Sequence, residues 1–252
     1  MSPGPAKPAC FKAYDIRGRV PEELDSDLAY RIGLSMARFL EGRRFVVGRD
    51  CRTSSSDLSA AVAAGLLDAG ADVLDIGLCG TEMVYYTTFA HGLDGGVMIT
   101  ASHNPLGYNG MKLVRAEARP ISGDSGLDEI GANAVECDLE LTAPRGSVAT
   151  ADVLGEFVRF LLERVDVDRL RPLKIVANAG NGCAGPVVSA LAEHLPGRVI
   201  PLYFEPDGTF PQGVPNPLEP DNRERTADAV REAGAAVGVA WDGDFDRCFF
   251  FD

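Results

Sequence analysis

The chain has 252 residues, enough for one large domain or two of moderate size. Its 24 Lys and Arg residues against 37 Asp and Glu residues give a formal net charge of −13. Binding to nucleic acids and to anionic membranes depends mainly on Lys and Arg, so we expect neither partner. The six cysteines are dispersed and form no CxxC pair, and the N-terminus lacks an apolar leader, which together predict a cytoplasmic protein.

Apolar periodicity in the first half of the chain alternates between helix and strand. We expect, in chain order, a helix at 28–39, a strand at 45–48, a helix at 58–66, a strand at 73–76, a helix at 82–90, strands at 96–100 and 111–114 and a helix at 127–135. Asp25, Ser26 and Asp27 are N-cap candidates for the first helix. This order predicts a layered α/β domain with a mostly parallel sheet.

The same alternation restarts after a predicted linker at residues 142–147. The expected elements are a helix at 154–165, a strand at 173–177, a helix at 186–194, a strand at 199–203, a helix at 223–233 and strands at 236–240 and 248–251. A proline-rich segment at 205–220 interrupts the series. We therefore predict two α/β domains, at residues 1–145 and 146–252.

Three aspartates follow the predicted strand at 236–240 directly. Asp242, Asp244 and Asp246 alternate in sequence, and a tight loop would let their oxygen ligands converge on Mg²⁺. Without a cation, three carboxylates this close would repel one another. Arg247 next to them suits phosphate geometry. Two alternatives stay open: a solvated acidic turn, and an aspartyl nucleophile that forms an acyl-phosphate.

A serine lies at the end of another predicted strand, in the segment TASHNP at residues 100–105. Ligands of α/β sheets bind at such strand ends, and Asn104-Pro105 forces a turn there. Ser102 is thus a candidate nucleophile, with His103 available for proton transfer. Neighbouring residues of an extended chain point in opposite directions, so we expect no direct Ser–His pair. An ordinary strand-end turn is the alternative.

Two basic residues and one glycine-rich loop are weaker candidates. Lys112 is either a proton donor or phosphate contact, or simply solvated, and Arg17 either binds phosphate or pairs with Asp15. Residues 180–185 fit a G-x-G-x-x-G loop between a strand and a helix, and Glu205 follows at the distance of a ribose-binding acid. A nucleotide-binding oxidoreductase is therefore a further alternative, although the proline-rich segment interrupts the expected second α/β unit.

Four segments together resemble one family. FKAYDIRG at 11–18, TASHNP at 100–105, YNGMK at 108–112 and DGDFDR at 242–247 occur in this order and spacing in the α-D-phosphohexomutases. The resemblance covers nearly the whole chain and is greatest to the bacterial phosphomannomutase branch. It implies two consecutive three-layer α/β/α domains with mixed sheets, and it makes the glycine-rich loop part of the second-domain scaffold.

The resemblance also implies roles for individual residues. Ser102 would be the phosphoserine, and its phosphate would bind Mg²⁺ together with the three aspartates. The groups that would handle phosphate and protons are Arg17, His103, Lys112 and Arg247.

The implied activity is interconversion of mannose 6-phosphate and mannose 1-phosphate through a hexose 1,6-bisphosphate, which feeds GDP-mannose and polysaccharide synthesis. Phosphoglucomutase activity is an alternative, as is a non-catalytic metal-binding fragment. The Gly-Glu-x-Ser-Gly sugar loop and the C-terminal phosphate loop of the family do not occur in this sequence. We therefore expect the missing C-terminal domains to be required for turnover.

Overall fold

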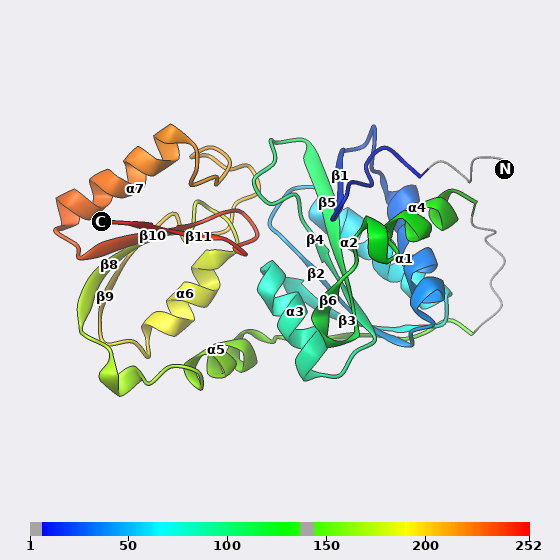
Figure 1. Cartoon of the computed structure of the whole chain (residues 1–252), viewed down its shortest axis with the longest axis horizontal. Coiled ribbons are helices and arrows are strands. Elements are labelled where there is room, and N and C mark those ends of the chain that lie inside the picture. Colours follow the sequence, from blue (N-terminus) through cyan, green and yellow to red (C-terminus); the bar gives the residue numbers. More distant parts are fainter. Residues whose placement is uncertain (1–6, 137–143) are drawn as a thin grey trace. The chain divides into compact units, whose positions relative to one another are not determined.

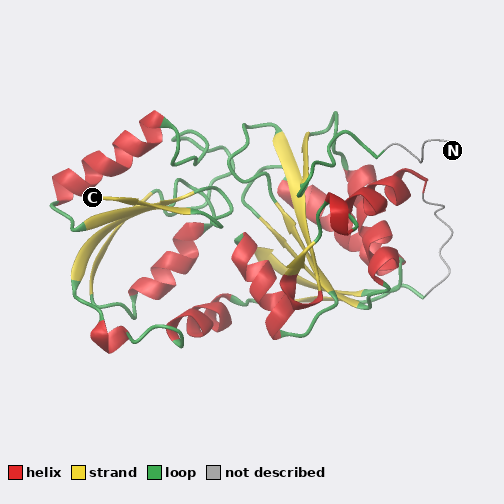
Figure 2. Ribbon diagram, in the orientation of Figure 1, coloured by secondary structure: helices red, strands yellow, loops and turns green. Residues whose placement is uncertain are grey.

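The chain forms two compact units in a computed structural model that describes residues 7–136 and 144–252. Unit 1 contains the described residues of Met1–Ala101 and Gly107–Asp152, and unit 2 contains Ser102–Leu106 and Val153–Asp252. Cys137 and residues 142 and 143 of the expected linker lie outside the described residues. Each unit is an α/β/α domain with a mixed sheet, which confirms the expected fold class (Figure 2).

Unit 1 is built on the larger sheet, with strand order β1-β5-β4-β2-β3-β7 and β6 paired to β5. Strands β4, β2, β3 and β7 run parallel, and β5 pairs antiparallel with β4, β1 and β6. In chain order its elements are β1 (Ile16–Arg19), α1 (Ser26–Leu40), β2 (Arg44–Arg49), α2 (Ser55–Asp68), β3 (Asp72–Leu78), α3 (Thr81–Ala90), β4 (Gly95–Ile99), β5 (Tyr108–Arg115), β6 (Arg119–Pro120), α4 (Leu127–Glu136) and β7 (Val148–Thr150).

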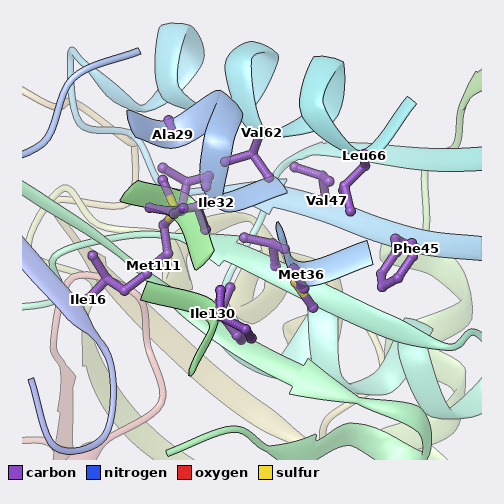
Figure 3. Packing of buried hydrophobic residues seen from close by; sticks show 14 of the residues in the cluster. Ile16, Ala29, Ile32, Met36, Phe45, Val47, Val62, Leu66, Met111 and Ile130 are labelled. Carbon is purple, nitrogen blue, oxygen red and sulfur yellow. The ribbon is translucent and has the colours of Figure 1, made fainter. Parts of the chain in front are cut away.

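Alternate residues of the central strands point to opposite faces of this sheet. Phe45 and Val47 of β2 face a core made with α1, α2 and α4, where Ile32, Val62 and Ile130 are fully buried (Figure 3). Helix α3 covers the other face (Figure 1), where a Cβ atom at Gly48 of β2 would lie only 2.8 Å from Val84. The period-two pattern of the strands therefore places the sheet between two helical layers.

Helices α1 and α2 pack backbone to backbone. A Cβ atom at Gly65 of α2 would lie 2.0 Å from the carbonyl oxygen of Tyr30, and one at Gly33 of α1 would lie 2.2 Å from that of Val62. Helix α1 begins at its N-cap Asp25, one of the three candidates, whose carboxylate accepts a hydrogen bond from the Leu28 N–H.

Unit 2 has a four-stranded sheet with strand order β11-β10-β8-β9. Strands β9, β8 and β10 are parallel, and β11 pairs antiparallel with β10. Helices α6 and α7 lie on opposite sides of this sheet (Figure 1). Its elements are α5 (Leu154–Leu162), β8 (Leu173–Asn178), α6 (Ala184–Ala192), β9 (Gly197–Leu202), α7 (Pro220–Ala233), β10 (Val237–Trp241) and β11 (Cys248–Phe251).

Most predicted elements occur within a few residues of their expected bounds. The helix expected to reach Val165 ends at Leu162, and β1, β6 and β7 were not expected. Short 3-10 helices also occur, at Ala116–Ala118, Gly123–Ser125 and Val167–Arg169. Within the described ranges, no helix has both the length and the apolar character needed to cross a membrane.

Candidate active site

The acidic motif forms the loop of a β-hairpin in unit 2. Strands β10 and β11 end their pairing at Trp241 and Cys248, which leaves a six-residue loop at 242–247. The Asp242 N–H donates to the Arg247 carbonyl at 3.3 Å and the Phe245 N–H to the Asp242 carbonyl at 3.1 Å. Phe245 adopts a left-handed conformation with φ of 55°. The tight loop turns the alternating side chains toward one another, because the backbone is no longer extended.

The three aspartates converge in this loop as predicted. One oxygen from each of Asp242, Asp244 and Asp246 lies within 4.8 Å of the other two. Opposite ligands of an octahedral Mg²⁺ ion are about 4 Å apart, so this set of oxygen donors suits such a cation. The side chains of Asp242 and Asp244 are buried, which does not fit a solvated acidic turn, while that of Asp246 is 25% exposed.

The electrostatic environment of Asp242 reflects this crowding. The pKa of Asp242 is raised to about 6, mainly by burial and then by the neighbouring Asp244 carboxylate, while the hydrogen bond from Ser102 opposes the shift. Arg247 forms an ion pair with Asp242 at 2.5 Å, and its own side chain is 42% exposed. The loop thus carries more negative charge than its single arginine balances.

Ser102 lies against this loop although 140 positions separate it from Asp242. Its hydroxyl donates to Asp242 Oδ2 at 2.5 Å and accepts from Arg247 Nη2 at 2.7 Å. The residue is buried, and its φ of 51° places the backbone in the left-handed region, which is uncommon for residues other than glycine. Such strain is typical of functional sites.

The expectation of no direct Ser–His pair is wrong. His103 Nδ1 lies 3.1 Å from Ser102 Oγ, and the same nitrogen accepts a hydrogen bond from Arg247. The left-handed backbone at Ser102 is the reason, because neighbouring side chains point apart only in an extended chain. The structure therefore brings four predicted residues into one cluster: Ser102, His103, Asp242 and Arg247.

Arg17 and Lys112 belong to unit 1. Arg17 pairs with Asp15 at 2.9 Å, which was one of its two expected roles, and also donates to the Thr100 carbonyl at 3.1 Å. Lys112 on β5 donates to Thr81 Oγ1 at 3.4 Å. Arg17 thus holds the end of the segment that leads to Ser102.

Backbone contacts around Gly243 were not foreseen from the sequence. A Cβ atom there would lie 2.5 Å from the Ser102 carbonyl oxygen, so only glycine allows this approach of the two loops. On its other side, the Cys183 N–H donates to the Gly243 carbonyl at 3.0 Å, and a Cβ atom at Gly182 would lie 2.7 Å from that carbonyl oxygen. The glycine-rich loop at 180–185 therefore supports the acidic loop. Its glycines were the feature of the sequence that could have indicated this close backbone contact.

A buried polar network in unit 1 lies at the ends of β2 and β4. Asp50 accepts hydrogen bonds from Ser55 Oγ at 2.5 Å and from the Arg52 N–H at 2.9 Å, and its carboxylate lies 3.5 Å from Arg52 Nε. Asn109 donates to the same Ser55 hydroxyl at 2.9 Å, and Arg52 donates to the Tyr108 carbonyl at 3.1 Å. Burial raises the pKa of Asp50, although Ser55 and Arg52 oppose the shift. This network fixes the start of β5, which follows the serine loop.

Both units match models of known protein families. Residues 8–137 match the family described as phosphoglucomutase/phosphomannomutase, alpha/beta/alpha domain I, and residues 155–252 match its alpha/beta/alpha domain II. The chain belongs to the phosphoglucomutase/phosphomannomutase family. The glycine-rich loop lies inside the domain II match, so the dinucleotide alternative is set aside in favour of a structural loop of this family.

Individual relatives agree with the family assignment. The chain is 53% identical over 251 residues to a phosphomannomutase of Escherichia coli, covering 96% of the chain and 55% of that protein. It is 53% identical over 242 residues to a protein of Xanthomonas campestris described as phosphohexose mutases, covering 54% of it. A solved structure of a phosphoglucomutase/phosphomannomutase family protein from Burkholderia thailandensis matches 97% of the chain with a TM-score of 0.88 at 34% identity, and the match covers 55% of that structure. The chain spans about half the length of the relatives it matches.

Proposed function

We propose that this chain carries the phosphoryl-transfer centre of a phosphohexomutase, with Ser102 as the phosphoryl carrier. The observation that supports this most directly is the hydrogen bond of 2.5 Å from the Ser102 hydroxyl to Asp242. A serine whose hydroxyl borders three converging carboxylates and an arginine has the groups that phosphoryl transfer needs, because that reaction depends mainly on positioning and charge neutralisation.

Asp242, Asp244 and Asp246 would hold Mg²⁺, with an oxygen of phospho-Ser102 as a further ligand. When bound, the cation neutralises phosphate charge and polarises the transferring group. Arg247, which already donates to the Ser102 hydroxyl, would contact the phosphate oxygens. The Gly243 backbone keeps the serine loop and the acidic loop in register for this contact.

Proton transfer falls to His103 or Lys112 in this proposal. The His103 ring nitrogen lies 3.1 Å from Ser102 Oγ, where it can exchange a proton with the serine or with an incoming sugar hydroxyl. We assign Lys112 and Arg17 to the sugar phosphate on the strength of their motifs, with Arg17 oriented by Asp15.

The proposed reaction moves phosphate between O6 and O1 of mannose through a hexose 1,6-bisphosphate, which also serves as activator. It would supply mannose 1-phosphate for GDP-mannose and polysaccharide synthesis in the cytoplasm. We take the two catalytic domains to be residues 1–145 and 146–252, and we propose that further domains, present in the longer relatives, are required to bind the sugar. The two relatives named above, a phosphomannomutase and a protein described more broadly as phosphohexose mutases, favour mannose while keeping glucose as the alternative sugar.

Phosphorylation of the chain tests the proposal. The 252-residue chain is incubated with Mg²⁺ and a hexose 1,6-bisphosphate and then mapped by peptide mass spectrometry. Phosphate is expected on Ser102, and none is expected in Ser102→Ala, while the exposed-site control Ser56→Ala should behave as the wild type. Phosphate on Asp242 would support the aspartyl-nucleophile alternative instead. No phosphate on either residue would support a non-catalytic metal-binding fragment.

Turnover tests the need for further domains. Conversion of mannose 6-phosphate to mannose 1-phosphate should be little or none with this chain alone. It should appear when the C-terminal domains of a relative are added or fused. Full turnover by the chain alone would contradict this part of the proposal.

A further inference from the structure

The proline-rich segment between β9 and α7 packs against the acidic loop. Pro215 is buried, and its ring lies between two glycines: a Cβ atom at Gly180 would lie 2.5 Å from Pro215 Cβ, and one at Gly243 would lie 3.5 Å from Pro215 Cγ. The side of Gly243 on which a Cβ atom would project therefore faces both the Pro215 ring and the Ser102 carbonyl oxygen. A displacement of Pro215 can therefore reach the loop of carboxylates through the backbone of Gly243.

Pro215 is held from helix α7 by one amide side chain. Asn222 Nδ2 donates to the Val214 carbonyl at 3.1 Å and to the Asn216 carbonyl at 3.0 Å. These two carbonyls flank Pro215, which has no N–H of its own with which to anchor the segment. The two hydrogens of one amide thus fix the backbone on both sides of the ring.

The first turns of α7 orient this amide. Arg225 Nη1 donates to the Gln212 carbonyl at 2.6 Å and contacts Asn222 Oδ1 at 3.5 Å, so the amide oxygen faces Arg225 and the amide nitrogen faces the carbonyls. Thr226, fully buried, accepts from Asn178 at 2.9 Å at the end of β8. Helix α7 is thereby tied to the sheet edge from which the acidic loop emerges.

We infer that Asn222 is a positioning residue for the acidic loop, acting through Pro215 and Gly243 on the spacing of the three carboxylates. Its side chain forms hydrogen bonds with Val214, Asn216 and Arg225 rather than with the acidic loop or the serine. This inference rests on the proposed metal site, and it adds a residue outside the motifs that define that site. Loss of both amide hydrogen bonds should release Pro215 and widen the arrangement of the carboxylates. Mg²⁺ tolerates little change in ligand geometry.

Mn²⁺ affinity of the metal-free chain, measured by electron paramagnetic resonance, tests the inference. Asn222→Leu keeps a branched side chain of similar size but removes both donors, and it should weaken Mn²⁺ binding about tenfold, as lost supporting hydrogen bonds do at other metal sites. Pro215→Ala keeps the Asn222 donors but removes the ring, and it should weaken binding in the same direction. Glu224→Gln, at an exposed position of the same helix, should leave affinity unchanged.

Thermal unfolding in excess chelator separates positioning from general stability. If both variants unfold at lower temperature but bind Mn²⁺ as tightly as the wild type, the inference is overturned. Should Asn222→Leu fail to fold, Pro215→Ala decides the question. A wild-type chain that binds no Mn²⁺, or an Asp244→Asn variant that binds as well as wild type, removes the proposed metal site and this inference with it. Normal wild-type binding with unaffected Asn222→Leu and Pro215→Ala removes the inference alone.

Discussion

The buried charges at the carboxyl ends of the strands differ between the two sheets: they are paired with an opposite charge in unit 1 and grouped with like charges in unit 2. In unit 1, the carboxylate of Asp50 is buried next to the guanidinium of Arg52, with Ser55 completing its hydrogen bonds. In unit 2, Asp242 and Asp244 are both buried with their oxygens converging, and the one arginine of the loop is 42% exposed. The first arrangement contains its own counter-charge, whereas the second gathers like charges.

This difference distinguishes a buried charge with a structural role from buried charges with a proposed functional role. A buried charge with its partner in place holds strands together and needs nothing further. Converging carboxylates destabilise the fold unless a cation joins them, so their presence in a buried loop favours the proposed cation site. The same sheet edge of the same kind of domain thus holds a paired structural charge in unit 1 and the proposed metal site in unit 2.

The largest effect should come from breaking the unit 1 pair. Asp50→Ala leaves the Arg52 guanidinium buried without its carboxylate, and it should lower the free energy of unfolding by about 3–5 kcal/mol. Urea unfolding followed by circular dichroism measures this loss. Asp57→Ala, at an exposed position in the first turn of α2, should cost less than about 1 kcal/mol. Equal losses in the two variants would mean that the pair is not structural.

In unit 2, neutralising a buried carboxylate should raise the free energy of unfolding rather than lower it. Asp244→Asn removes repulsion against Asp242, so the metal-free chain should gain about 1 kcal/mol of unfolding free energy. Mg²⁺ affinity, measured by calorimetry, should fall on the order of 100-fold because a ligand oxygen loses its charge. Asp221→Asn, exposed on α7, is the control and should change neither quantity. A destabilised metal-free Asp244→Asn would contradict the comparison.

A change in unfolding free energy of comparable size, but of opposite sign, is expected from crowding the acidic loop without altering its charge. Gly243→Ala places a Cβ atom 2.5 Å from the Ser102 carbonyl oxygen, and it should lower the free energy of unfolding by about 1–3 kcal/mol. Gly155→Ala, in helix α5 with open space around the new methyl group, should instead stabilise by about 0.5–1 kcal/mol. Opposite signs for the two glycine variants in urea unfolding are the expected result.

The smallest expected effect is on the pH dependence of stability and comes from an exposed carboxylate, that of Asp72. It provides a reference for the larger effects of the buried carboxylates. Hydrogen bonds from the Ser147 hydroxyl and N–H lower the pKa of Asp72. Because the folded pKa lies below the unfolded one, this stabilisation is present above about pH 4 and is lost as the pH falls through the lowered pKa. Asp72→Asn should therefore show a shallower loss of stability in acid-unfolding titrations. A slope identical to that of the wild type would show that the Ser147 contacts are not coupled to ionisation.

Regular elements of this fold could be predicted because their apolar periods are long and clean. Helix α1 and strand β4 follow their patterns closely, whereas β6 and β7 have only two and three residues and carry no period. Strand β1 contains Arg17 and Gly18, and it is a strand because it pairs with β5. A pairing partner some ninety residues away leaves no local signal.

The chemical groups of the candidate site could be predicted, but their mutual orientation could not. The alternation of Asp242, Asp244 and Asp246 indicates a metal loop directly. The Ser102–His103 contact depends on a backbone conformation that serine rarely adopts, and tertiary contacts impose it here. The contacts of Pro215 and Asn222 depend on packing between residues that are distant from the acidic loop in sequence. The sequence alone therefore showed the proline-rich segment only as an interruption in the series of predicted helices and strands.

The hairpin that carries the acidic loop has a consequence for how the site forms as the chain folds. Asp242 and Arg247 are five positions apart, whereas Ser102 and Asp242 are 140 apart. Loop-closure entropy grows with the logarithm of separation, so bringing the serine to the aspartate costs about 3 kcal/mol more than closing the hairpin. We therefore expect short-range chain closure to gather the three carboxylates before the serine joins them. The proposed cation site and the proposed phosphoryl carrier would then form at different stages of folding.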